Sequence, residues 1–222
     1  MANGIILNNV KAFSDMEASA FKKQFGNAQF SLNTSGKVNV KDCVFDQNGY
    51  NCIEIGLNND ITPPSAIDIE NCDFSGQLLN NAILIFGTQD NAVINIKNCK
   101  FGTLSNVIRL SNRTNAKNVV VNIENCSVEQ WETKNPYVGF LILEDYTSKN
   151  EEEFLEANRF SPEKLTINIS NLQYKGEKVV PEDLAAVVSS KNEKQLIYIS
   201  VDNVNYMIPE YDAEMYPVIN FK

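Results

Sequence analysis

The sequence contains no histidine among its 222 residues. Without an imidazole, a single chain cannot supply a Ser-His or Cys-His catalytic pair, and it cannot bind a metal ion through histidine. The five cysteines include no CxxC pair, which argues against a disulfide framework and against a zinc site. We therefore expect no metal ion and no cofactor.

Long apolar runs and an excess of positive charge are also missing. No segment approaches the roughly 20 apolar residues of a membrane helix, and the first residues lack the basic and apolar regions of a signal peptide. Lysine and arginine number 19 against 28 acidic residues, so the net charge is −9. Because an acidic chain repels phosphate, we expect no nucleic-acid partner. The missing apolar segment and signal peptide predict no membrane partner and a protein made in the cytoplasm.

Asparagine is abundant, with 31 residues, and a repeat accounts for much of it. Apolar residues alternate with polar ones and end in Asn-Cys or a related pair, as in Ile94-Asn95-Ile96-Lys97-Asn98-Cys99. Seven copies centre on residues 10, 43, 72, 99, 126, 172 and 204, and the shortest spacings are 27 to 29 residues. An alternation with a period of two predicts a β-strand in each copy.

A second β-rich run follows the repeat, for example at Cys52–Ile55 and Ala82–Phe86, and an aromatic residue often lies two positions after the cysteine. Two or three short strands per unit, without a regular helix between them, are typical of stacked coils. The sequence therefore predicts an all-β fold, a parallel β-helix solenoid of about seven coils with short helical insertions.

Stacking would place equivalent residues about 4.8 Å apart, like on like. We expect the cysteines to line up inside, and the charges before each corner to form favourable pairs between coils. Asn98 is expected to belong to a ladder and Asn95 is not. The predicted corner ladder consists of Asn9, Asp42, Asn71, Asn98, Asn125, Asn171 and Asn203. The inward ladder consists of Cys43, Cys72, Cys99 and Cys126, continued by Leu172 and Val204, beside a stack of Phe45, Phe74 and Phe101. The paired charges are Lys41, Glu70, Lys97 and Glu124.

These I-x-I-x-N-C-x-F coils resemble the right-handed parallel β-helix, or pectin-lyase-like, superfamily over roughly residues 5 to 206. That superfamily includes polysaccharide lyases, glycoside hydrolases and many phage tailspike and virion proteins. The resemblance implies a fold and does not choose among these functions. We expect a single domain over residues 1–222, with coils at about 5–206, a helical insertion at 14–25, an acidic insertion at 146–164 and an extended tail at 207–222.

Acidic side chains raise the alternative of an enzyme. Asp68, Glu70 and Asp73 fall in one coil, and Glu54 and Arg109 fall on the second-strand face. The chain has no Asp-Asp element and no calcium loop of the D-x-D-x-D-G type. We therefore interpret these residues as solvated charges on the outer faces and predict no catalytic residue.

The expected function is a non-enzymatic structural or interaction protein of a larger assembly. The resemblance suggests a bacteriophage virion component, such as a capsid decoration, a head fibre or a tail part. Shell or tail proteins, a second copy or a glycan are the expected partners. One alternative is a tailspike-like protein that binds or degrades polysaccharide, as a glycoside hydrolase or polysaccharide lyase. Another is a scaffold whose Glu151–Glu153 segment binds a basic partner. The candidate partner-binding residues are Trp131, Tyr137, Tyr211, Tyr216 and Phe221.

Overall fold

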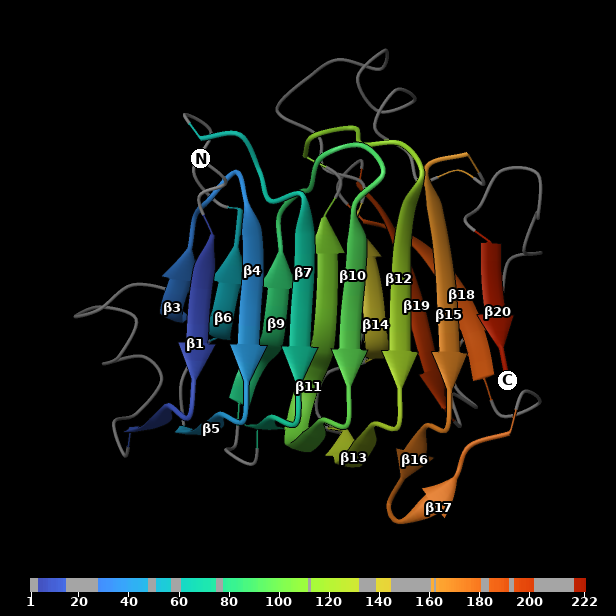
Figure 1. Cartoon of the computed structure of the whole chain (residues 1–222). Coiled ribbons are helices and arrows are strands. Elements are labelled where there is room, and N and C mark those ends of the chain that lie inside the picture. The colour runs from blue at the N-terminus through green and yellow to red at the C-terminus, as the bar shows by residue number, and fades with distance from the viewer. Residues whose placement is uncertain are drawn as a thin grey trace.

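Every regular element in the described part of the chain is a β-strand. The computed structural model describes residues 4–14, 28–47, 51–56, 61–74, 78–111, 113–131, 139–144, 161, 163–180, 184–191, 194–201 and 218–222. Within them the strands form two sheets that face each other as layers (Figure 1). The all-β solenoid expected from the repeat is confirmed. The predicted helical insertion begins at Ser14, which closes a strand, and its residues 15–25 lie outside the described residues.

Sheet A holds the repeat itself. Its neighbouring strands all pair in parallel, and those from β1 to β15 are successive copies of the repeat. In Figure 1 they run side by side from the blue end of the molecule to the red end. The strands of sheet A, in spatial order, are β1 (Ile5–Asn8), β4 (Lys37–Lys41), β7 (Ala66–Glu70), β10 (Val93–Lys97), β12 (Val119–Glu124), β15 (Leu165–Ser170) and β20 (Val218–Phe221).

Sheet B contains the other strands of each coil. Short strands follow the corner after sheet A: β2 (Lys11–Ser14), β5 (Val44–Gln47), β8 (Asp73–Phe74), β13 (Ser127–Trp131) and β16 (Gln173–Tyr174). The second strands are β3 (Ala28–Leu32), β6 (Asn51–Ile55), β9 (Leu78–Ile85) and β14 (Gly139–Glu144), while β11 (Lys100–Ser111) spans both rows. The remaining strands of sheet B are β17 (Glu177–Lys178), β18 (Leu184–Lys191) and β19 (Lys194–Val201).

The seventh copy of the repeat was placed wrongly by sequence. Residues 199–201 belong to β19, which runs antiparallel to β14 and to β18 in sheet B. The seventh described strand of sheet A is instead β20, where Asn220 lies beside Asn168 of β15. The predicted ladder members Asn203 and Val204 lie outside the described residues, as do residues 146–160 of the acidic insertion and 207–217 of the tail.

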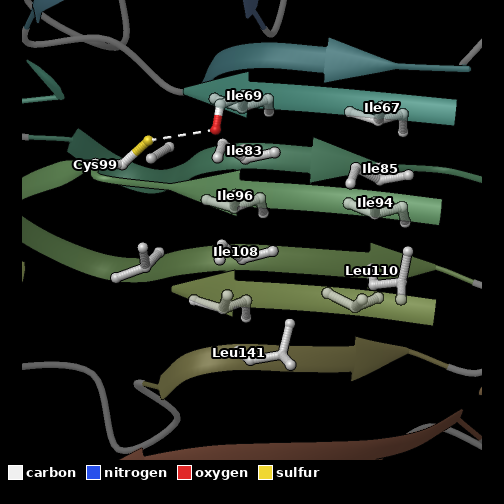
Figure 2. Close-up of a cluster of buried hydrophobic side chains, with 14 of the residues drawn as sticks. Ile67, Ile69, Ile83, Ile85, Ile94, Ile96, Cys99, Ile108, Leu110 and Leu141 are labelled. Atoms are coloured by element: carbon white, nitrogen blue, oxygen red, sulfur yellow. Dashed lines mark hydrogen bonds between the residues drawn. The ribbon is translucent and has the colours of Figure 1, made fainter. Parts of the chain in front are cut away.

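Alternation along the strands builds the core between the two sheets. In β10 the apolar side chains of Ile94 and Ile96 are buried, while Asn95 between them faces outward. Figure 2 shows these isoleucines in rows with Ile67 and Ile69 of β7, opposite side chains from β9, β11 and β14. Like residues stacked at the strand spacing give close packing without voids.

Cysteines and phenylalanines continue the stacking inside the corner. Cys43, Cys72, Cys99 and Cys126 are buried free thiols, and Leu172 continues their row. Each of the last three thiols lies near a backbone carbonyl of the preceding coil, as Cys99 does with Ile69 at 3.7 Å (Figure 2). Burial raises the pKa of the Cys43 thiol, so it behaves as a small apolar side chain. The rings of Phe45, Phe74 and Phe101 stack with centroids 5.0 and 5.1 Å apart.

The corner ladder is confirmed for its described members beyond Asn9. From Asn71 onward, each side-chain amide donates a hydrogen bond to the corner residue of the preceding coil, at 3.0 to 3.2 Å. The backbone turns with a positive φ at each corner, for example 54° at Asp42 and at Asn98. Asparagine and aspartate tolerate this left-handed conformation better than other non-glycine residues.

A second ladder lies on the outer face of sheet A, and the expectation that Asn95 belongs to no ladder is wrong. Asn95 donates to Asp68 at 2.7 Å and accepts from Asn122 at 2.9 Å. The ladder continues through Asn168 at 2.8 Å to Asn220 at 2.9 Å. Beside it, the expected charge pairs form between Lys41 and Glu70 at 2.9 Å, and between Lys97 and Glu124 at 3.1 Å.

Substitutions in the two ladders should separate side-chain bonding from backbone strain. Asn98→Leu and Asn95→Leu each remove two amide hydrogen bonds, with a loss of about 1 kcal/mol in all at these exposed or partly buried positions. Of these two residues, only Asn98 has a positive φ. Leucine in that backbone conformation lowers the free energy of unfolding by about 1 kcal/mol more. In urea unfolding we expect Asn98→Leu to lower the free energy of unfolding about twice as much as Asn95→Leu. Equal losses would contradict the contribution of the backbone.

Candidate functional site

The outer side of the second strands β6, β9 and β14 in sheet B is covered, unlike the outer face of sheet A. Every residue of β6 is buried, although alternate side chains of this strand point to opposite sides. Leu84 of β9 and Ile142 of β14, which lie in the same row as Glu54 and Arg109, are 7% and 3% exposed. Glu54 is 3% exposed. The interpretation of Glu54 as a solvated outer-face charge is therefore wrong, while Arg109 in the same row is partly exposed.

Glu54 is held as a buried carboxyl group. The Asn51 amide donates to its Oε1 atom at 2.8 Å, and Asn51 also accepts two hydrogen bonds from Asn81. Desolvation raises the pKa of Glu54 above its ordinary value, while the Asn51 hydrogen bond and the charge of Arg113 lower it by less. Near neutral pH, the burial of this carboxyl group therefore opposes folding.

The pH dependence of stability should reveal this group. The pKa of Glu54 is higher in the folded chain than in the unfolded chain. The contribution of Glu54 to stability is therefore fully present below its unfolded pKa and is lost as the pH rises through its folded pKa. Glu54→Gln removes the titration and keeps an oxygen for the Asn51 amide. We expect the melting temperature of this variant to rise relative to the natural chain between about pH 4 and about pH 7. A constant difference across that range would contradict a raised pKa.

Arg109 and Glu144 form a two-point ion pair on this covered side. Arg109 Nη2 lies 2.7 Å from Glu144 Oε1, and its Nε donates to Oε2 at 3.1 Å. Both side chains are mostly buried, at 27% and 9% exposure. This geometry fixes β11 against β14 and uses both carboxylate oxygens, so Glu144 is occupied in a structural contact.

The remaining candidate carboxylates do not assemble with Glu54. Asp68 and Glu70 lie in sheet A, where Asp68 accepts the Asn95 amide and Glu70 pairs with Lys41. Asp73 begins β8 in sheet B, and its buried Oδ1 atom has no hydrogen-bond partner in the structure. The acids are therefore distributed over both sheets. Among the residues that the structure describes, no group of three or more Cys, Asp or Glu side chains could hold a metal ion.

A polar groove runs along the asparagine corner. It has a volume of about 540 Å³ and is bordered by the β17 residue Lys178. Its other lining residues come from three coils: Asn98, Cys99, Lys100, Asn125, Cys126, Ser127, Asn171 and Gln173. Lys100 and Lys178 are both exposed, and within the described residues neither forms an ion pair. The lining carries two positive charges and no carboxylate, so the groove favours an anionic group.

The first coil of the solenoid presents apolar side chains to solvent. Ile6 of β1 is 73% exposed and Phe13 of β2 is 70% exposed, more than any other large apolar side chain in the described part of the chain. In the sequence this coil is the weakest copy of the repeat, with Ala12 at the aromatic position. The pattern showed that the copy was atypical but did not show that Ile6 and Phe13 would be exposed.

The predicted partner-binding residues are only partly within the described chain. Trp131 ends β13, where its backbone pairs with Leu104 of β11. Phe221 lies in β20 beside Ile169 and is half-buried against the core. Tyr137, Tyr211 and Tyr216 lie outside the described residues. Partner binding by this set stays a prediction.

Comparisons of the chain with protein families, with curated proteins and with solved structures gave no match. A search of the described residues for a helix long and apolar enough to span a membrane also found none. The description of this chain as a parallel β-solenoid with asparagine ladders therefore rests on its structure alone.

Proposed function

We propose that this chain is a non-enzymatic structural protein that docks into a larger assembly through its first coil. The observation that carries the proposal is the exposure of Ile6 and Phe13 on strands at the edge of both sheets. Exposed apolar groups beside an unpaired strand edge are typical of interaction surfaces. The stacked ladders support a rigid body, and Glu54 and Glu144 support the non-enzymatic assignment because both are held in internal contacts.

The resemblance of the coils to the pectin-lyase-like superfamily supports a finer proposal. Within that superfamily, the match to a rigid, small β-helix favours a component of a bacteriophage virion: a capsid decoration, a head fibre or a tail part. Shell or tail proteins would then be the other components of that assembly. This step depends on analogy with the superfamily.

Quantitative mass spectrometry of purified particles tests the virion proposal. We expect the chain in particles, at a copy number near that of the main shell protein for a decoration and at a few copies for a fibre or tail part. Its absence from particles would overturn the virion proposal. As a control, a protein of the producing cell that is not packaged should be depleted from the same particles.

A second candidate function, binding to an acidic saccharide, is favoured by the groove at the asparagine corner. The ladder amides of Asn98 and Asn125 each retain one N–H and one lone pair for a ligand hydroxyl. Lys100 and Lys178 could pair with a carboxylate or sulfate group. Calorimetry with a carboxylated hexasaccharide should show binding that Lys100→Ala weakens and that Lys117→Ala, an exposed lysine outside the groove, leaves unchanged. No binding by the natural chain would remove this candidate.

A further inference from the structure

Three strands at the N-terminal end of the solenoid form an open edge. In the described part of the chain, β1 pairs only with β4, β2 only with β5 and β3 only with β6. Lys11 is the one charged residue in these three strands, and none of them contains proline. Natural proteins usually protect edge strands with charges, prolines or bulges. Within the described residues this edge has little such protection, which makes it a candidate surface for pairing with another chain.

The described core is also less buried at this end. The inward side chains of the second coil are completely buried, whereas their counterparts in the first coil are only partly buried. The pairs in question, first coil before second, are Ile5 and Val38, Leu7 and Val40, Ala12 and Phe45, and Phe30 and Ile53. A chain docked on β1 and β3 would remove this apolar surface from water, which is favourable in proportion to the area covered.

We propose that the partner at this edge is a second copy of the same chain, docked first coil against first coil about a twofold axis. The two β1 strands would pair antiparallel with Ile6 opposite Ile6 of the other copy. The inference rests on the proposed docking function and names its partner. Such a contact is self-complementary and closed, as in most homodimers.

Charge favours two copies meeting at this end. The chain as a whole carries a net charge of −9, so two copies repel each other over most approaches. The described segments of the first coil, residues 4–14 and 28–36, contain Lys11 as their single charged residue. The described part of this surface is therefore nearly neutral, which limits the like-charge repulsion that two acidic molecules would meet there.

The opposite end of the solenoid does not fit the first coil. In a head-to-tail stack, Ile6 would continue the row of Asn168 and Asn220 and would set an apolar side chain on the ladder amide of Asn220. In the row of short strands, sheet B ends there with β17, which runs antiparallel to β16, so strand β2 of a first coil could not continue that row in parallel. The geometry therefore favours a closed dimer over an open filament.

Disulfide trapping tests the geometry directly. Directly opposed residues in an antiparallel pair have Cβ atoms about 4.5–5.5 Å apart, close enough for a disulfide after small adjustments. All five natural cysteines are buried and would not react. On mild oxidation, Ile6→Cys should give a covalent dimer. The control Val93→Cys, at a 38% exposed position of β10 with a strand on each side, should stay monomeric. Failure of Ile6→Cys to cross-link would overturn the twofold arrangement.

Light scattering after size-exclusion chromatography tests the partner. The natural chain should elute as a dimer, Ile6→Lys as a monomer with an unchanged circular dichroism spectrum, and Val93→Lys as a dimer. A natural chain that is monomeric at its highest soluble concentration but present in particles would overturn the second copy and leave the proposed function standing. A dimer that is absent from particles would support the second copy and overturn the virion proposal.

Discussion

Phe74→Ala should lower the free energy of unfolding by roughly 3 to 5 kcal/mol, the range for removing a fully buried aromatic ring. The Phe74 side chain is completely buried between Phe45 and Phe101, with centroid distances of 5.0 and 5.1 Å and interplanar angles of 15° and 12°. The neighbouring rings belong to strands that are fixed by parallel pairing on both sides of β8. They cannot move together to fill the cavity, so most of the cost remains.

Urea unfolding of Phe74→Ala and Phe13→Ala at low protein concentration provides the comparison. Phe13 is 70% exposed, so its truncation should change the stability of the separated chain by no more than about 0.5 kcal/mol. The same substitution is then tested inside and outside the stack. Equal losses for the two variants would show that the aromatic stack does not hold the coils together.

Arg109→Met should be the second strongly destabilising change, with a loss of roughly 3 kcal/mol. The substitution removes both contacts to Glu144, whose side chain is 9% exposed. A carboxylate in so covered a position has lost much of its hydration, and the ion pair with Arg109 offsets this cost. Without Arg109 that compensation is gone. Thermal and urea unfolding of the variant measure the effect.

The double variant Arg109→Met with Glu144→Leu separates the charge from the packing. Leu84 and Ile142 flank Arg109 in the same row, so a methionine there has apolar neighbours. Replacing both members of a buried ion pair by apolar residues is often neutral. We expect the second substitution to restore most of the lost stability. Additive losses would mean that Arg109 stabilises the fold through its packing and not through its charge.

The repeat predicted the solenoid because each coil has the same alternation of apolar and polar residues and the same corner residue type. Alternation marked the strands of sheet A, and Asn98 marked a corner that needs a positive φ. Asn95 was misjudged because an outward position in a strand is open to either charged pairs or amide ladders. The recurrence of Asp68, Asn95, Asn122 and Asn168 at one position of the frame was a signal that could have identified this second ladder.

Pairing between distant segments was the part that local pattern could not supply. Residues 199–204 match the alternation of the repeat. Nevertheless β19, which contains residues 199–201, pairs antiparallel with β14 in sheet B. The residues of one strand do not determine which sheet edge that strand joins. Asn220, flanked by Ile219 and Phe221, lies beside β15 in sheet A, where its amide extends the ladder from Asn168.

The candidate site was less predictable than the fold for a similar reason. Glu54 sits in an alternating run and was assigned to solvent, but both sides of β6 are buried. Whether an outer face is covered depends on segments far away in the sequence. The exposure of Ile6 likewise follows from the position of β1 at the end of a stack. That position cannot be predicted from the residues of the strand itself.

Both ladders begin with an aspartate, Asp42 at the corner and Asp68 on the face, and every later member is an asparagine that donates toward it. A carboxylate accepts but cannot donate, so it gives each column of amides a fixed origin and one direction of growth. A tandem duplication of the 27 residues from 98 to 124 would therefore find matching amides on both of its sides. The length of this molecule can change by whole coils in its interior, while its two ends keep their separate chemistry.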